Sequence, residues 1–210
     1  LIDFWRFNLS YLPHIYSQQP ESASGTWNYV EYRAPEGFVL AVTPFNFTSI
    51  AGNLPTSPAL MGNTVVWKPA STAVFAAYWL MKLFEDAGLP PGVINLVPGS
   101  GEQIAGTALA HTNLGGVHFT GSTEVFQGMW GTVGAHISSY KSYPRVVGET
   151  GGKDFVFAHA SADPDDLVAN LIRGAFEYQG QKCSAASRAY IPKSLWRGLR
   201  DRLLDEVRAI

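Results

Sequence analysis

Cysteine is nearly absent from this sequence: Cys183 is the only one in 210 residues. A single thiol excludes an internal disulfide and a cysteine zinc site, and it suits a reducing compartment without proving one. Apolar runs are short and interrupted, so no transmembrane helix is expected. Charge is sparse and almost balanced, with 15 basic and 17 acidic residues. No basic cluster favours a nucleic-acid partner.

Metal-ligand spacing is also missing. The five histidines are scattered, so we expect no metal site: His14, His111, His118, His136 and His159. The sequence starts at Leu1 without a methionine and stops at Ile210 within an amphipathic pattern. We therefore expect an internal piece of a longer polypeptide. Its compartment is left open, cytoplasmic in a bacterium or the mitochondrial matrix in a eukaryote.

Residues 36–149 alternate short apolar runs with helical patterns. Continuous apolar runs are typical of strands that are covered on both faces. The expected strands are 38–42, 64–68, 93–97, 116–119 and 145–149, and the expected helices are about 48–61, 72–87, 102–110 and 122–139. This alternation predicts an α/β fold with a parallel sheet and right-handed crossovers.

The flanking segments differ from this pattern. Residues 1–16 predict a helix disturbed by a proline, and residues 17–35 predict a protruding β-hairpin with an aromatic strand at 26–34. Large exposed apolar surface usually marks an interface, so we expect the hairpin to mediate subunit contact in a homo-oligomer. A domain boundary is expected near residue 150, and residues 150–210 would begin a second α/β domain. There we expect a strand in "DFVFA" and a helix from Asp163 to about Tyr178.

Polar and small residues follow the expected strands, where open parallel sheets bind ligands. These strand-end residues are Asn46, Lys68, Ser71, Gly101, Gly121, Ser122 and Glu149. The "GSGEQI" segment lacks the third glycine of a dinucleotide fingerprint, whereas "TGSTEV" is either an ordinary helix cap or a diphosphate site. Lys68 either simply ends a strand or binds a ribose.

The remaining candidates also have two interpretations. A lone cysteine is most often a small buried hydrophobe, and Asn46 either satisfies the local backbone or donates to an oxyanion. Glu149 is either a surface strand terminus or a partly buried base. Taken together, a thiol, an amide donor, a carboxylate and a dinucleotide site are the components for covalent oxidation of an aldehyde.

Five motifs resemble the aldehyde dehydrogenase superfamily in the same order: "TPFNF", "VVWKPAS", "HFTGSTEV", "VGETGGK" and "GQKCSAASR". The 34-residue separation between Glu149 and Cys183 is also similar to that of the family. Segments such as "DFWRFN" and "AFEYQGQKCSA" most resemble the branch that oxidises L-glutamate γ-semialdehyde, which forms from Δ1-pyrroline-5-carboxylate, in proline catabolism.

The resemblance implies a Rossmann-like NAD-binding domain at 36–149 and the start of a catalytic domain at 150–210. It implies that Cys183 is the nucleophile, that Asn46 helps to hold the oxyanion, and that Glu149 activates water. It assigns cofactor contacts to Thr43, Lys68, Ser71, Gly101, Gly121, Ser122, Thr123, Glu124 and Val125.

The sequence departs from the family at two positions. Ser71 stands where many NAD-dependent relatives have glutamate, so NADP is a weaker alternative cofactor. His14 stands where some relatives have glutamate near the substrate entrance. Three alternatives stay open: another aldehyde substrate, a non-catalytic homologue, and a thiol hydrolase, which would need a histidine base.

Overall fold

The computed structural model describes residues 1–210, which form two compact units, Leu1–Glu149 and Thr150–Ile210. They are called unit 1 and unit 2. The first holds a five-stranded sheet and the second a two-stranded sheet.

Unit 1 is built on a fully parallel sheet with strand order β3-β2-β1-β4-β5. Its strands are β1 (Phe38–Thr43), β2 (Thr64–Pro69), β3 (Ile94–Leu96), β4 (Leu114–Thr120) and β5 (Arg145–Glu149). The predicted α/β fold is therefore confirmed, with each strand within two residues of its expected position. The chain winds outward from β1 in both directions, so a topological switch point lies between β1 and β4.

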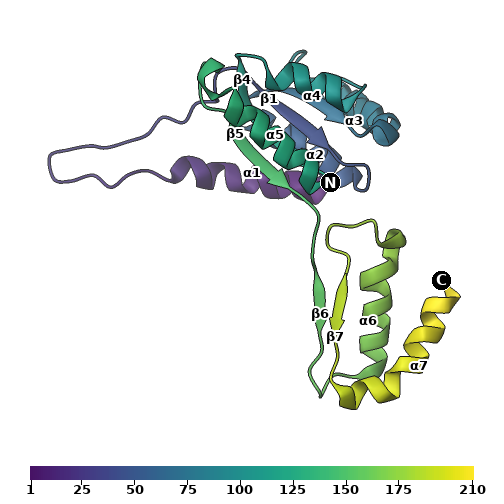
Figure 1. Cartoon of the computed structure of the whole chain (residues 1–210). Coiled ribbons are helices and arrows are strands. Elements are labelled where there is room, and N and C mark those ends of the chain that lie inside the picture. Colours follow the sequence, from purple (N-terminus) through teal and green to yellow (C-terminus); the bar gives the residue numbers. More distant parts are fainter. The chain divides into compact units, whose positions relative to one another are not determined.

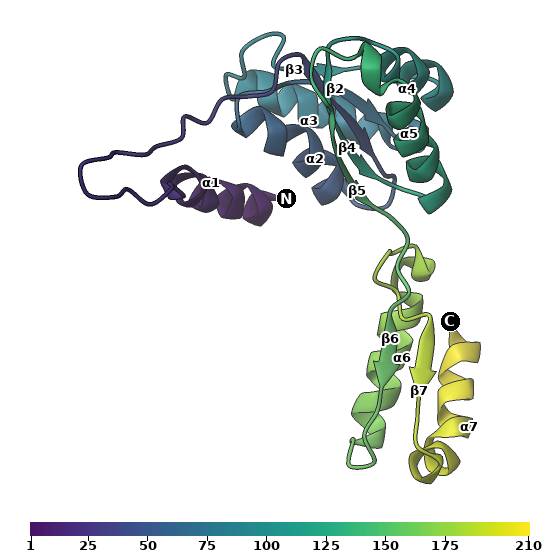
Figure 2. The same cartoon turned by 60° about the vertical axis from the view of Figure 1, so that its left-hand side comes forward.

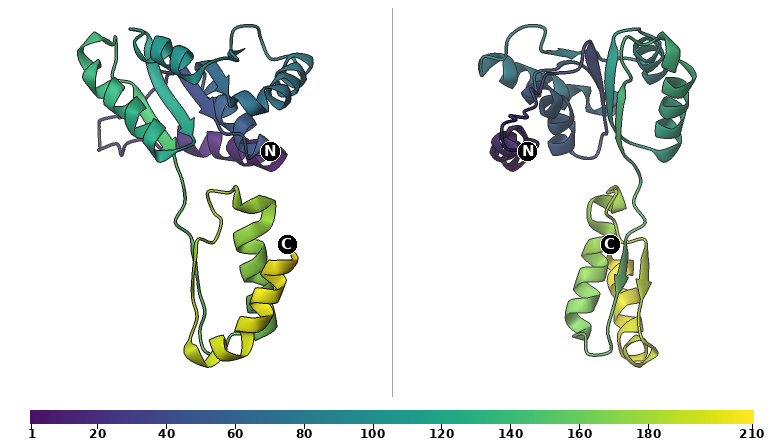
Figure 3. Two further views of the ribbon diagram at one scale, coloured as in Figure 1. Left: turned by 45° about the vertical axis from the view of Figure 1, so that its right-hand side comes forward. Right: turned by 90° about the vertical axis from the view of Figure 1, so that its left-hand side faces the viewer.

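Helices cover both faces of this sheet (Figure 3). On one face, Trp67 of β2 packs with residues of α2 (Thr48–Leu60) and α3 (Val74–Asp86). On the other, Leu40 of β1 packs with residues of α4 (Gly101–Leu109) and α5 (Thr123–Ala135). Cover on both faces is the physical reason for the continuous apolar runs in the strands.

Side chains determine where two helices of unit 1 begin. The Ser100 hydroxyl accepts a hydrogen bond from Gln103 N at the start of α4, and the Ser122 hydroxyl accepts one from Val125 N at the start of α5. The expected helix at 122–139 is interrupted near His136. A short 3₁₀ turn, η2 (Ile137–Ser139), follows, and another, η1 (Ser71–Ala73), precedes α3.

The N-terminal helix α1 (Ile2–Ser17) lies against α2, although Pro13 is inside it. Trp5 Nε1 donates a hydrogen bond to Thr56 Oγ1 at 3.0 Å, and Asn8 donates one to Asn53 at 2.8 Å. These long-range contacts anchor the part of the helix before Pro13, which itself has no backbone N–H to donate.

The predicted β-hairpin at 17–35 is wrong in one respect, because the segment contains no β-strand. It forms the long purple-blue loop between α1 and β1 in Figure 1. Its two arms are joined by side chains: Gln19 exchanges hydrogen bonds with Val30, and Ser22 with Asn28. An isolated two-stranded ribbon is marginally stable, so strand-forming residues alone do not produce a ladder here.

Unit 2 contains a two-stranded parallel sheet of β6 (Phe155–Phe157) and β7 (Arg188–Tyr190). Two helices, α6 (Pro164–Phe176) and α7 (Lys193–Ala209), run beside it in both views of Figures 1 and 2. Their apolar faces share one core with the sheet, formed around Val168 and Leu199. The strand in "DFVFA" was predicted, whereas no strand was predicted at β7.

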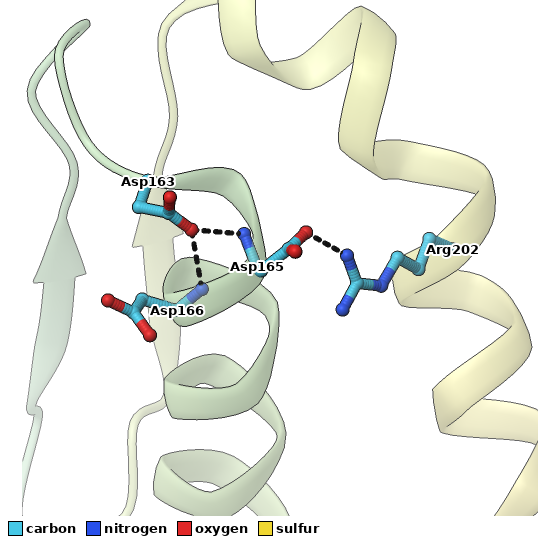
Figure 4. Close-up of polar contacts among 4 residues, drawn as sticks. All are labelled: Asp163, Asp165, Asp166 and Arg202. Atoms are coloured by element: carbon cyan, nitrogen blue, oxygen red, sulfur yellow. Dashed lines mark hydrogen bonds and ion pairs between the residues drawn. The ribbon is translucent and has the colours of Figure 1, made fainter.

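Helix α6 starts as the sequence predicts. The Asp163 carboxylate accepts hydrogen bonds from the backbone N–H groups of Asp165 and Asp166, at 2.8 and 3.1 Å (Figure 4). Asp165 then pairs with Arg202 of α7, which links the two helices. The C-terminal end was expected at about Tyr178, but α6 stops at Phe176. The next turn, η3 (Glu177–Gly180), has left-handed backbone at Tyr178 and Gln179.

Candidate active site

The ends of the parallel strands in unit 1 place most of the predicted cofactor residues at one edge of the sheet. In the strand register, Thr43 of β1 lies opposite Pro69 of β2, and Thr120 of β4 lies opposite Glu149 of β5. This edge includes the topological switch point between β1 and β4, where open α/β sheets bind ligands.

Lys68 and Gly101 lie next to each other at this edge. Lys68, near the end of β2, is 8% exposed. A Cβ atom built on Gly101, the first residue of α4, would be 3.6 Å from Lys68 Nζ. The ammonium group makes no ion pair or side-chain hydrogen bond within the chain. Ser71 follows, exposed at the first position of η1.

Thr43 is a structural residue as well as a cofactor candidate. Its side chain is buried, and its Oγ1 accepts a hydrogen bond from Trp67 Nε1 at 3.0 Å. Its backbone oxygen accepts one from Ala70 N at 3.0 Å. These contacts join the ends of β1 and β2 and hold the segment that carries Lys68.

The turn between β4 and α5 is tied to the end of β5. Gly121 N donates a hydrogen bond to the backbone oxygen of Glu149 at 3.1 Å. Ser122 caps α5, and the side chains of Thr123, Glu124 and Val125 are exposed in its first turn. Helix N-termini favour anions because their first N–H groups have no partner in the helix. The arrangement therefore fits a phosphate-bearing ligand.

The two remaining catalytic candidates of unit 1 are in different settings. Glu149 is the last residue of β5 and is exposed. This exposure agrees with the interpretation of Glu149 as a surface strand terminus rather than a partly buried base. It also leaves the carboxylate accessible to water. Asn46 is half-buried in the bend that joins β1 to α2.

Cys183 lies in unit 2, in the turn between η3 and β7, and is half-buried. The turn is anchored on both sides of the thiol. Ala186 N donates to Gly174 O at 2.8 Å, and Ser187 N donates to Asp154 O at 2.9 Å. The N–H of Cys183 itself donates no hydrogen bond within the chain. It is thus available to an oxyanion.

A charged pair lies beside the thiol in the sequence. Lys182 forms an ion pair with Glu177, and the ammonium group lowers the pKa of the Glu177 carboxyl below its usual value, first through their hydrogen bond and then through charge attraction. The pair spans the left-handed turn that precedes Cys183, with Glu177 at its first residue and Lys182 two residues after its last.

Sequence reasoning missed one residue of this region. Gly152 approaches the backbone of Cys183 so closely that a Cβ atom on it would be 1.5 Å from the Cys183 carbonyl oxygen. The only signal in the sequence is the pair of glycines within the "VGETGGK" motif. No group of three or more histidine, cysteine or acidic side chains is placed to hold a metal ion.

The sequence profile of the aldehyde dehydrogenase family matches residues 1–210. The chain belongs to the aldehyde dehydrogenase family. The Delta-1-pyrroline-5-carboxylate dehydrogenase of Agaricus bisporus is 52% identical over 212 residues, which cover 100% of this chain and 39% of that protein. The mitochondrial Delta-1-pyrroline-5-carboxylate dehydrogenase of Dictyostelium discoideum is 53% identical, with 100% and 38% coverage.

A solved structure of the family is also similar. The Delta-pyrroline-5-carboxylate dehydrogenase of Mycobacterium tuberculosis, in a crystal structure bound with NAD, has a TM-score of 0.93 and 62% identity. The similarity covers 98% of this chain and 38% of that one. The chain thus spans about two fifths of the length of its relatives in the family.

Proposed function

We propose that this protein oxidises L-glutamate γ-semialdehyde to L-glutamate with NAD, as a step of proline catabolism. The main support is the 62% identity to the Mycobacterium tuberculosis enzyme, whose structure was solved bound with NAD. The residues that the motifs predict as nucleophile, base and amide donor are Cys183, Glu149 and Asn46. A non-catalytic homologue would have no reason to keep all three.

The strand-end edge of unit 1 fits NAD. Lys68 is 8% exposed as a residue and makes no ion pair or side-chain hydrogen bond within the chain, so its ammonium group is available to a ligand hydroxyl or anion. We propose that Lys68, Ser71 and Gly101 hold the adenosine ribose region, with Thr43 contributing backbone contacts. The first turn of α5, from Gly121 to Val125, would hold the diphosphate and the adjoining nicotinamide half.

The chemistry assigns one role to each catalytic candidate. The Cys183 thiolate attacks the aldehyde carbon, and the carbonyl electron pair moves to oxygen, giving a thiohemiacetal oxyanion. The Asn46 side-chain amide and the Cys183 N–H donate hydrogen bonds to that oxygen. Bound NAD would supply the hydride acceptor that takes this adduct to a thioester. Glu149 removes a proton from water, which attacks the thioester carbon. The C–S bond then breaks, so the acid leaves and the thiolate is restored.

The decisive test is NADH absorbance with glutamate γ-semialdehyde and NAD, using the full-length protein. Cys183→Ala should produce no NADH. Glu149→Gln should release up to one NADH per site and then stall as acyl-enzyme, because water is a far weaker acid than a thiol and needs the base more. Its steady-state rate should fall by about 10²–10⁴-fold.

The outcomes separate the possibilities. Intact-mass measurement should detect the acyl adduct in Glu149→Gln and none in Cys183→Ala. Turnover by Cys183→Ala would overturn the proposal outright. An active wild type that prefers another aldehyde would keep the mechanism and reject the substrate. If Glu149→Gln turns over at the wild-type rate, Glu149 is only a strand terminus.

Cofactor choice is tested at Ser71. A carboxylate there would repel the 2′-phosphate of NADP and accept a hydrogen bond from the NAD ribose. We therefore expect Ser71→Glu to raise the ratio of kcat/KM for NAD to kcat/KM for NADP. Ser71→Gln, which introduces a side chain of the same shape as glutamate but without the charge, should change this ratio less. An unchanged ratio in both variants would remove Ser71 from the ribose site.

We also propose that the 17–35 loop mediates contact in a homo-oligomer. Trp27 and Tyr29 stack on each other in it and are 80% and 59% exposed, and such aromatic surface is typical of interfaces. Deleting residues 20–33 should lower the mass measured by light scattering, and an unchanged mass would reject the proposal.

None of the helices combines the length and apolarity needed to cross a bilayer. We infer the mitochondrial matrix for a eukaryotic source and the cytoplasm for a bacterial one.

A further inference from the structure

Two adjacent glycines follow Glu149, and their surroundings are different. A Cβ atom added to Gly151 would have no heavy atom within 4 Å. The same atom on Gly152 would be 1.5 Å from the carbonyl oxygen and 2.7 Å from the carbonyl carbon of Cys183. Since the sequence alone does not distinguish the two glycines, the difference comes entirely from the fold of unit 2.

The Gly152 contact involves main-chain atoms, which cannot turn away as a side chain can. Cβ atoms are essentially never found within 3.0 Å of a heavy atom outside their own residue and its two chain neighbours. Any side chain at 152 would therefore push the Cys183 carbonyl, or the 150–154 segment, by more than an ångström. The Asp154 carboxylate, 2.3 Å from the same point, belongs to a flexible side chain and could move at little cost.

The two segments are also tied together next to this contact. Ser187 N donates to Asp154 O at 2.9 Å, directly before the pairing of Phe155 with Arg188 in the β6–β7 sheet. The turn that carries Cys183 is therefore held from one side by a hydrogen bond and limited on the other by Gly152. The backbone N–H of Cys183 donates no hydrogen bond within the chain.

We propose that Gly152 is a positioning residue, whose missing side chain sets the location of the Cys183 backbone and hence of its thiol and N–H. The inference rests on the proposed function, because it assumes that Cys183 is the nucleophile. An ångström of misplacement can cost about 10²-fold in rate, since attack and oxyanion binding both depend on orientation.

The test compares Gly152→Ala with Gly151→Ala in the full-length protein. For Gly152→Ala we expect the NADH burst rate and kcat to fall by about 10²-fold, with a smaller change in KM. We also expect the pH profile of Cys183 alkylation by iodoacetamide to shift, because the thiol meets a different environment. Gly151→Ala should stay within about threefold of wild type, since its added methyl group enters open space.

Thermal unfolding separates positioning from simple destabilisation. A merely structural role would lower the melting temperature but leave the burst rate and alkylation profile of the folded sites unchanged, and that result would overturn the proposal. Equal losses in the two alanine variants would overturn it as well. If Cys183→Ala is inactive while Gly152→Ala behaves like wild type, only the present inference fails. If Cys183→Ala is active, the proposed function fails first.

A second variant covers the case in which Gly152→Ala does not fold. Ser187→Pro removes the N–H that donates to Asp154 and puts the ring Cδ against the Asp154 carbonyl oxygen in its place, whereas Ser187→Ala keeps that N–H. Slower alkylation and a slower burst in Ser187→Pro but not in Ser187→Ala would support the proposal. Wild-type kinetics in both variants would overturn it.

Discussion

The two sheets of this chain carry similar apolar strands in different surroundings. In the five-stranded sheet, Val65 and Trp67 of β2 are 0% exposed beneath α2 and α3, and α4 and α5 cover the opposite face. In the two-stranded sheet, Phe155 and Phe157 of β6 are 62% and 74% exposed, because α6 and α7 cover one face only. The same kind of run thus stabilises one unit by burial and leaves apolar surface on the other.

The comparison shows that an apolar run in the sequence indicates a strand whose side chains are suited to burial. Whether those side chains are buried depends on which elements of the chain cover the strand. Burial is worth about 25 cal/mol per Å² of apolar area, so exposed phenylalanines contribute little to the stability of unit 2. Local interactions, such as the Asp163 cap, then carry a larger share there. Four substitutions in the 210-residue chain test this contrast.

The largest effect is expected at the centre of unit 1. Trp67→Ala removes a fully buried ring and its hydrogen bond to Thr43, and should lower the free energy of unfolding by about 3–5 kcal/mol. Urea denaturation followed by far-UV circular dichroism measures it. Trp130→Ala is the matched control, since Trp130 is 58% exposed and should change stability by less than about 0.5 kcal/mol. Equal losses would contradict the burial of Trp67 under α2 and α3.

A medium effect is expected at the first turn of α6. Asp163→Ala removes the acceptor for two backbone N–H groups, and loss of such a cap costs about 1 kcal/mol. Asp163→Asn keeps a capping oxygen and should recover most of it. The urea transition of unit 2 should move in the alanine variant only. A shift confined to unit 1 would contradict this reading.

A smaller effect, confined to acid pH, is expected from His118. Burial lowers its pKa below the ordinary value of 6.5, although its Nδ1 contacts the Leu54 carbonyl oxygen. The unfolded chain therefore takes up a proton first, and stability is complete above pH 6.5 and lost as the pH falls from there toward the folded pKa. Denaturation between pH 5 and 8 should show this slope.

The His118 slope has a matched control. His118→Gln should flatten it, whereas the same change at the exposed His111 should not. A slope that survives in His118→Gln would assign the acid sensitivity to other groups.

The smallest effect is expected on the open face of unit 2. Phe157→Ala removes a ring that is already 74% exposed, so the urea midpoint should correspond to a change within about 0.5 kcal/mol. A loss of 2 kcal/mol or more would mean that this face is covered in solution, and the contrast between the two sheets would disappear.

The sequence by itself determined the features that depend on near neighbours. Continuous apolar runs located the strands of unit 1 because both faces needed cover. Asp163 followed by Pro164 located the start of α6 because a cap needs only residues within one turn. The ordered motifs indicated the family before any fold was considered, since they record residue types and spacing.

The tertiary structure alone decided which segments meet. Residues 26–34 have strand-forming side chains but no ladder, because pairing needs a partner and not only a propensity. β7 exists because Arg188–Tyr190 lies in register with β6, more than 30 residues earlier. Gly151 and Gly152 are identical in the sequence, and only the fold places one of them against Cys183. Contacts between residues far apart in the chain have no local signature, which is the physical reason that sequence reasoning missed Gly152.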